Sequence, residues 1–132
     1  MQGDGGVLLF LDLDGFKAIN DRHGHETGDA VLRTVAERLT GGSRATDVIS
    51  RLAGDEFVLL SVGVTPEDGK RFAARLVHEI ALPIDTARGP MTVTASCGVL
   101  PIEAGLTAKQ LLDAADAAMY RAKKQGRNRV SL

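Results

Sequence analysis

The feature that most constrains this chain is an uninterrupted apolar run, Val7 to Leu11, that leads directly into Asp12, Leu13 and Asp14. Such a run is typical of a strand that is buried on both faces. Because side chains alternate along a strand, Asp12 and Asp14 point to one face and Leu13 to the other. A carboxylate at the end of a buried strand is costly unless a cation meets it, so this end of the strand is predicted to attract positive charge.

A second pair of acids lies in the segment DVISRLAGDEFVLL, between two apolar stretches that are predicted to pair as a β-hairpin. The turn contains Gly54, which can take a positive φ, followed by Asp55 and Glu56. Polar residues at a turn can also serve only to keep the edge of a sheet soluble. For this turn taken by itself, that interpretation stays open. If the hairpin meets the first strand, its acids join Asp12 in a set of hard oxygen ligands that suits Mg²⁺ and a triphosphate better than zinc.

Composition limits the class of protein. The 132 residues are 44% apolar, which is enough for one domain with its own core. A net charge of −1 argues against a general role at nucleic acids or membrane surfaces. Cys97 is the lone cysteine and permits no internal disulfide. The chain has no apolar run long enough for a membrane span and no signal-peptide pattern, so a cytoplasmic location is expected.

One helix is predicted before the hairpin in the sequence and one after it. The first is expected near residues 28–40, where apolar residues recur at helical spacing, with Thr27 as its N-cap. The second begins at Thr65 and Pro66, because threonine is a good cap and proline suits the first helical position.

The C-terminal part continues the alternation of strands and helices. The segment LPIDTARGP is expected to be a connection that leads into a strand at residues 91–99. A last helix begins at Thr107, in capping-box spacing with Gln110, and a short strand at residues 128–132 follows it. The order β-α-β-β-α-β-α-β predicts an α/β (α+β) fold with a ferredoxin-like βαββαβ core, in which helices flank a central, mainly antiparallel sheet.

Four segments together resemble the GGDEF domain, the diguanylate cyclase family. They are FLDLDGFKAINDRHGHETGD, RLAGDEFVLL, TASCGV and ADAAMYRAKKQGRNRV, and the resemblance runs from Val7 to Val130. It implies a single GGDEF domain over residues 1–132, of the nucleotidyl-cyclase and polymerase-palm type. The family's N-terminal helix and its LTGLPNR-like segment have no counterpart in the sequence. The chain is therefore expected to belong to a longer protein with attached sensor or effector domains.

The resemblance implies a reaction in which two GTP molecules form cyclic di-GMP and two pyrophosphates. It places Asp12, the Leu13 carbonyl and Asp55 as ligands of Mg²⁺ or Mn²⁺, and gives Glu56 a part in activating the attacking hydroxyl. Metal ions neutralise charge on phosphates and orient an oxygen nucleophile, so the residue types suit this chemistry. One domain holds one GTP, and catalysis is therefore expected to need a homodimer.

Further positions match the family's substrate contacts. Asn20 and Asp29 match the positions that bind guanine, although a loop-capping Asn and an Asp near a helix N-terminus are equally ordinary without the family. Lys123 and Arg127 match triphosphate contacts, but both are also common near a helix C-terminus. The implied substrate-binding residues are Phe16, Lys17, Asn20, Asp29, Gly54, Lys123 and Arg127.

The segment RATD matches the family's RxxD inhibitory site. The resemblance implies that Arg44, Asp47 and Arg75 bind cyclic di-GMP and hold the enzyme inactive when product accumulates. Guanidinium groups suit both phosphate and guanine. The alternative is a local ion pair between Arg44 and Asp47, which contributes little at a surface.

The signature tetrad departs from the family at Ala53, which replaces the first glycine. If this position needed a positive φ, the methyl group would cost about 1 kcal/mol. Two functions therefore stay open. The first is an active cyclase, and the second is a non-catalytic module that binds GTP or cyclic di-GMP and regulates an attached domain.

Overall fold

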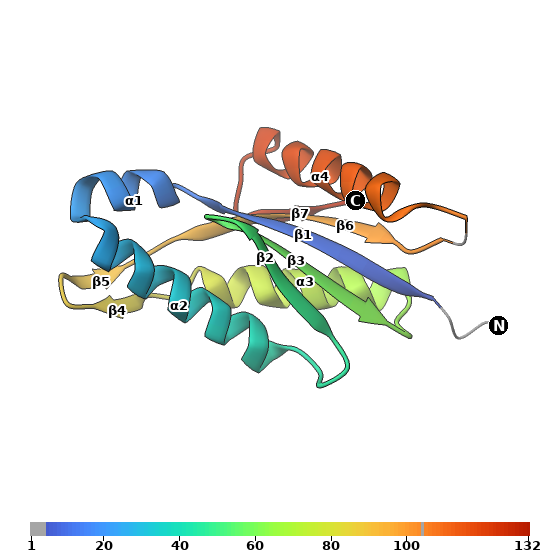
Figure 1. Ribbon diagram of the computed structural model, residues 1–132, viewed down its shortest axis with the longest axis horizontal. Helices are drawn as coiled ribbons and strands as arrows, with labels where there is room; N and C mark the ends of the chain where they lie inside the picture. The colour runs from blue at the N-terminus through green and yellow to red at the C-terminus, as the bar shows by residue number, and fades with distance from the viewer. Residues whose placement is uncertain (1–4, 104) are drawn as a thin grey trace.

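The computed structural model describes residues 5–103 and 105–132, which form a twisted sheet with helices on both faces (Figure 1). The strand order in the five-stranded sheet is β2-β3-β1-β6-β7. All neighbours are antiparallel except β6 and β7. The first four strands in this order have the arrangement of a ferredoxin-like core, as predicted. The strands are β1 (Gly6–Asp14), β2 (Val48–Ala53), β3 (Glu56–Val62), β6 (Thr94–Pro101) and β7 (Arg129–Ser131).

The central strand β1 is buried over its whole length, which confirms the prediction from its apolar run. One set of its side chains, which includes Leu9 and Leu11, belongs to the main hydrophobic core with residues of α2 and α3. The alternate set, Leu8 and Phe10, packs with Ala115 of α4. Helices α2 (His25–Gly42) and α3 (Pro66–Ile80) thus cover one face of the sheet, and α4 (Ala108–Lys124) covers the other (Figure 1).

Two of the helix starts agree with the sequence patterns. The Thr65 side chain accepts a hydrogen bond from the Asp68 N–H at 3.1 Å, and Pro66 occupies the first helical position of α3. Thr107 and Gln110 form a full capping box at the start of α4. Both caps satisfy backbone donors that a helix N-terminus leaves free.

Two elements in the N-terminal half differ from the expectation. A separate helix, α1 (Phe16–His23), lies in the segment for which no helix was expected. Helix α2 begins at His25, so Thr27 is a buried residue inside the helix and not its N-cap. Gly24 takes that place with a φ of 89°, and this positive φ, which glycine adopts without strain, separates the two helices.

The connection between α3 and the next long strand also contains structure. A two-stranded hairpin, β4 (Ile84–Thr86) and β5 (Gly89–Met91), lies where a plain connection was expected. Met91 belongs to this hairpin, and the strand expected at residues 91–99 runs over β6 instead. No helix in the described residues is long and apolar enough to cross a membrane.

The packing of α4 on the sheet depends on Gly98, in the middle of β6. A Cβ atom at this position would overlap the Ala115 carbonyl oxygen and the Met119 backbone nitrogen. Backbone atoms of a packed helix cannot yield as a flexible side chain does, so the contact restricts this position to glycine.

We expect Gly98→Ala to lower the free energy of unfolding by about 1 to 3 kcal/mol, because the added methyl overpacks the contact with α4. Gly41→Ala is the control, since Gly41 lies in helix α2 and a Cβ there meets no other atom. The control should be neutral or stabilising by about 0.5 kcal/mol. Urea unfolding followed by circular dichroism measures both changes, and equal stabilities for the two variants would contradict the prediction.

Candidate functional site

The end of β1 and the turn of the β2–β3 hairpin lie against each other. Asp12 is the cross-strand partner of Glu56 in the β1–β3 ladder. The Leu13 N–H donates a hydrogen bond to the Asp55 carbonyl oxygen at 3.1 Å, which ties the turn to the strand. The two acidic segments that are far apart in the sequence therefore meet in space, as the sequence analysis expected.

Asp12 has a buried carboxylate whose two oxygens differ in their surroundings. Its Oδ2 forms an ion pair with the Lys123 ammonium group of α4. Its Oδ1 is buried and accepts no hydrogen bond from the described residues. Burial raises the pKa of Asp12, and the nearby Asp55 raises it further against the opposing effect of Lys123. The carboxylate is thus incompletely neutralised by the protein itself.

Glu56 lies in the same acidic cluster. Burial raises the pKa of Glu56, and the negative charges of Asp12, Asp55 and Asp116 add to the effect, with only Lys123 acting in the other direction. Asp116 was not predicted from the sequence. Its spacing of seven residues from Lys123 places both on one face of α4, and this periodicity is the signal that could have found it.

The residues of this cluster fit a divalent cation. Among the described residues, no group of three or more His, Cys, Asp or Glu side chains could hold a metal ion alone. Mg²⁺ is commonly bound by one or two carboxylates, with water and substrate phosphates completing its shell. The unpartnered Asp12 Oδ1 and the adjacent Asp55 meet that requirement.

Asp14 has a structural role that the sequence left undefined. It accepts hydrogen bonds from the Ser96 hydroxyl at 2.7 Å, the Thr94 hydroxyl at 2.8 Å and the Asn128 N–H at 3.1 Å. The last bond anchors the loop after α4, in which Arg127 has a φ of 63°. Asp14 therefore fixes the loop that presents Arg127.

The N-terminus of α1 directly follows β1. Gly15 precedes the helix with a φ of 79° and makes no side-chain cap, and the first turn contains no acidic residue. Phe16 is buried, whereas Lys17 is exposed. An uncapped N-terminus offers backbone N–H groups and a positive dipole end, which together favour an anion.

Asn20 and Asp29 lie on the two neighbouring helices α1 and α2. Asn20 was considered as a loop residue, but it lies in α1, where its Oδ1 is buried and has no hydrogen-bond partner among the described residues. A Cβ at Gly28 would overlap this oxygen, so glycine leaves room for the amide. Asp29 is exposed and lies one turn inside α2, not in its first turn.

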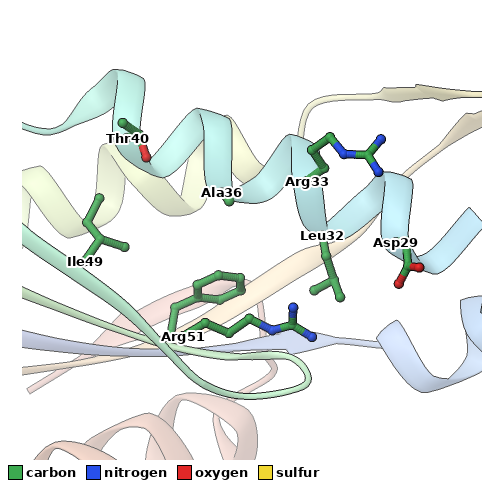
Figure 2. A pocket seen from close by; sticks show the side chains of 8 residues that line it. Asp29, Leu32, Arg33, Ala36, Thr40, Ile49 and Arg51 are labelled. Carbon is green, nitrogen blue, oxygen red and sulfur yellow. The ribbon is translucent and has the colours of Figure 1, made fainter.

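A cavity of about 620 Å³ lies between α2 and the β2–β3 hairpin (Figure 2). Asp29 lines it, but Asp12 and Asp55 do not. Its walls combine apolar side chains with arginines from both elements. The lining residues are Asp29, Leu32, Arg33, Ala36, Thr40, Ile49, Arg51 and Phe57.

Arg44 and Asp47 form a more extensive cluster than a surface ion pair. Their charged groups lie 3.2 Å apart, and the Arg44 guanidinium also donates to the Ser61 hydroxyl at 2.8 Å and to the Val62 carbonyl. The Asp47 side chain is fully buried. Burial by itself raises the pKa of Asp47, but hydrogen bonds from the Arg44 N–H, Ser61 and the Arg44 guanidinium together hold it below its usual range.

A pocket of about 240 Å³ opens beside this cluster and also contains Arg75. The Arg75 guanidinium donates to the Gly42 carbonyl at 2.8 Å and lies 5.3 Å from the centre of the Phe72 ring. The structure thus brings Arg44, Asp47 and Arg75 to one pocket, separate from the acidic cluster.

The turn itself differs from the expectation in its backbone. Neither Ala53 nor Gly54 has a positive φ. Ala53 is exposed, so its methyl group is accommodated without conformational strain. The Arg51 Nε donates to the Gly54 carbonyl at 2.9 Å and supports the turn from β2.

Comparison with known proteins finds relatives that match nearly the whole length of this chain. The family profile described as "Diguanylate cyclase, GGDEF domain" matches residues 2–129. The bifunctional diguanylate cyclase/cyclic di-GMP phosphodiesterase MucR of Pseudomonas aeruginosa is 48% identical over 123 residues, which is 92% of this chain. The match spans only 18% of MucR, so the chain is similar to one part of a longer protein.

Solved structures have the same fold. The GGDEF domain of YfiN (TpbB) from Pseudomonas aeruginosa is 36% identical, with a TM-score of 0.92 over 98% of this chain and 77% of that chain. The GGDEF domain of DgcB from Caulobacter crescentus, solved in complex with cyclic di-GMP, is 28% identical, with a TM-score of 0.91 over 98% of this chain and 78% of that chain. The chain belongs to the GGDEF domain family of diguanylate cyclases.

Proposed function

We propose that this domain condenses two GTP molecules into cyclic di-GMP and two pyrophosphates. The observation that carries the proposal is the buried, unpartnered Asp12 Oδ1 in a cluster of acids beside the uncapped N-terminus of α1. The acids suit a divalent cation and the helix N-terminus suits phosphate, so the two features together suit a metal-bound nucleotide.

Mg²⁺ or Mn²⁺, held by Asp12, Asp55 and the Leu13 carbonyl, would neutralise charge on the phosphates. Glu56 would accept the proton of the attacking 3′-hydroxyl, and its raised pKa suits a proton acceptor. A bond forms between this oxygen and the α-phosphorus of the other GTP, and the bond to pyrophosphate breaks. Each domain supplies one GTP, so two copies of the domain must face each other.

The remaining residues would bind and orient the nucleotide. The backbone at Phe16 and Lys17, the Lys17 side chain and the backbone at Gly54 would contact the triphosphate. Lys123 and Arg127 would neutralise it further, from α4 and from the loop that Asp14 anchors. These positions leave the guanine base to Asn20 and Asp29.

Replacing Asp55 by Asn should abolish turnover and weaken Mg²⁺-dependent GTP binding, because the change keeps the shape of the side chain and removes its negative charge. The measurement is incubation with GTP and Mg²⁺ at high protein concentration, followed by chromatographic separation of GTP and cyclic di-GMP. Asp113→Asn is the control, since this exposed carboxylate pairs with Lys109 on α4. Unchanged product formation by Asp55→Asn would exclude the metal assignment.

The domain should bind GTP at least about tenfold more tightly than ATP, because adenine leaves the polar groups of Asn20 and Asp29 unpaired. Asp29→Ala should reduce this preference by weakening GTP binding more than ATP binding. Titration calorimetry with each nucleotide and Mg²⁺ measures both effects. Equal affinities in the parent chain would remove the guanine-binding role of these residues.

The cluster of Arg44, Asp47 and Arg75 supports product binding as a second property. Cyclic di-GMP carries two phosphates and two guanines, which guanidinium groups and a carboxylate can recognise. Bound product would hold two domains in an arrangement that separates their GTP sites. The same cluster supports the alternative function, a non-catalytic module that regulates an attached domain. Cyclic di-GMP binding without any turnover of GTP would favour that alternative.

Arg44→Ala should lose cyclic di-GMP binding by tenfold or more, while GTP affinity stays near that of the parent chain, because the cluster lies apart from the acids. Arg71→Ala is a matched control, since Arg71 forms an exposed ion pair with Asp68 at the same i,i+3 spacing. Calorimetric titration with cyclic di-GMP compares the two variants. Parent-like binding by Arg44→Ala would reduce the cluster to a structural role.

A further inference from the structure

Arg51 occupies a position between the cavity and the turn that carries the acids. It lies on β2, where the pairing with β3 is irregular between Arg51 and Ala53. Its Nε donates to the Gly54 carbonyl oxygen at 2.9 Å, whereas its two terminal nitrogens form no hydrogen bond or ion pair with the described residues. The Gly54 bond therefore orients a planar guanidinium group whose remaining donors are free.

The free donors of Arg51 lie in the cavity that Asp29 also lines. Figure 2 shows the Arg51 guanidinium extending below Leu32. Asp29, on α2, points toward the same side of the cavity. Leu32 and Phe57 belong to the buried core and form part of the apolar lining of the cavity, which suits an aromatic ring. One cavity thus presents a carboxylate acceptor, a guanidinium donor and apolar surface.

This combination matches the edges of guanine. A carboxylate accepts from the N1–H and N2–H groups, and a guanidinium donates to the neighbouring O6 and N7 acceptors. Adenine has an amino donor in place of O6, which a guanidinium repels. We propose that Arg51 is a specificity-determining residue that reads the O6/N7 edge of guanine opposite Asp29. The inference rests on the proposed function, because it concerns the base of the same GTP.

Arg33 provides a matched comparison within the same cavity. It is an exposed arginine of α2 that also lines the cavity. In Figure 2 its guanidinium points away from the hairpin and from Arg51. Removing either charge changes the potential of the cavity, but only the Arg51 guanidinium extends from the hairpin below Leu32.

The test compares GTP with 7-deaza-GTP, which lacks the N7 acceptor, by titration calorimetry in the presence of Mg²⁺. The parent chain should bind 7-deaza-GTP about tenfold more weakly, as expected for the loss of one hydrogen bond to a charged group. Arg51→Gln should bind GTP more weakly and bind the two nucleotides equally. Arg33→Gln should retain the parent's tenfold ratio, even if both affinities fall.

Equal binding of the two nucleotides by the parent chain, or an unchanged ratio in Arg51→Gln, would overturn the inference. Absence of GTP binding by the parent would overturn the proposed function as well, so the two failures are distinguishable. Circular dichroism checks the fold of each variant. If Arg51→Gln does not fold, Arg51→Met decides, because methionine keeps an unbranched side chain and has no N–H donor. A tenfold ratio retained in Arg51→Met would also contradict the inference.

Discussion

The burial of negative charge at the end of β1 is the constraint on which the rest of the site depends. Asp12 lies in the central strand, and within the described residues its one cationic partner is Lys123. The helix that supplies Lys123 also covers Leu8 and Phe10 through Ala115. When α4 packs on the sheet, it therefore covers these apolar side chains and also brings Lys123 to Asp12. Because neutralisation remains incomplete, the folded domain keeps a buried carboxylate oxygen whose surroundings suit a cation.

Asp12 and Asp14 lie on the same face of β1, because side chains alternate along a strand, but the two acids have different roles. Asp14 has three hydrogen-bond donors, from Thr94, Ser96 and Asn128, and acts as an anchor. Asp12 keeps one oxygen unpartnered and is the acid that suits a metal. The distinction follows from the neighbours that each residue meets, since both carboxylates are buried in the same strand. A satisfied carboxylate stabilises the loop, whereas an unsatisfied one attracts a ligand.

The sequence predicted the features that depend on local signals. The apolar run of β1, the hairpin, and the caps Thr65 and Thr107 each have a pattern that a few adjacent residues define. Helix α1 was missed because its stretch FKAINDRH supplies only Phe16 and Ile19 to the core, too few for a periodic pattern. The hairpin of β4 and β5 was missed because strands of three residues show no clear alternation. Burial of Asp47 and the raised pKa of Glu56 arise from contacts between distant segments, which periodicity does not report.

Ala53 replaces the first glycine of the signature. This replacement distinguishes what the backbone conformation of the turn requires from what the charges at the turn require. Residues 53–56 contain no positive φ, so the backbone does not require glycine there. Two bonds hold the turn, from the Leu13 N–H to the Asp55 carbonyl and from Arg51 to the Gly54 carbonyl. Neither bond involves the side chain of residue 53. The proposed metal site depends on the position and charge of Asp55 and Glu56 beside Asp12, and an exposed methyl group at residue 53 changes neither.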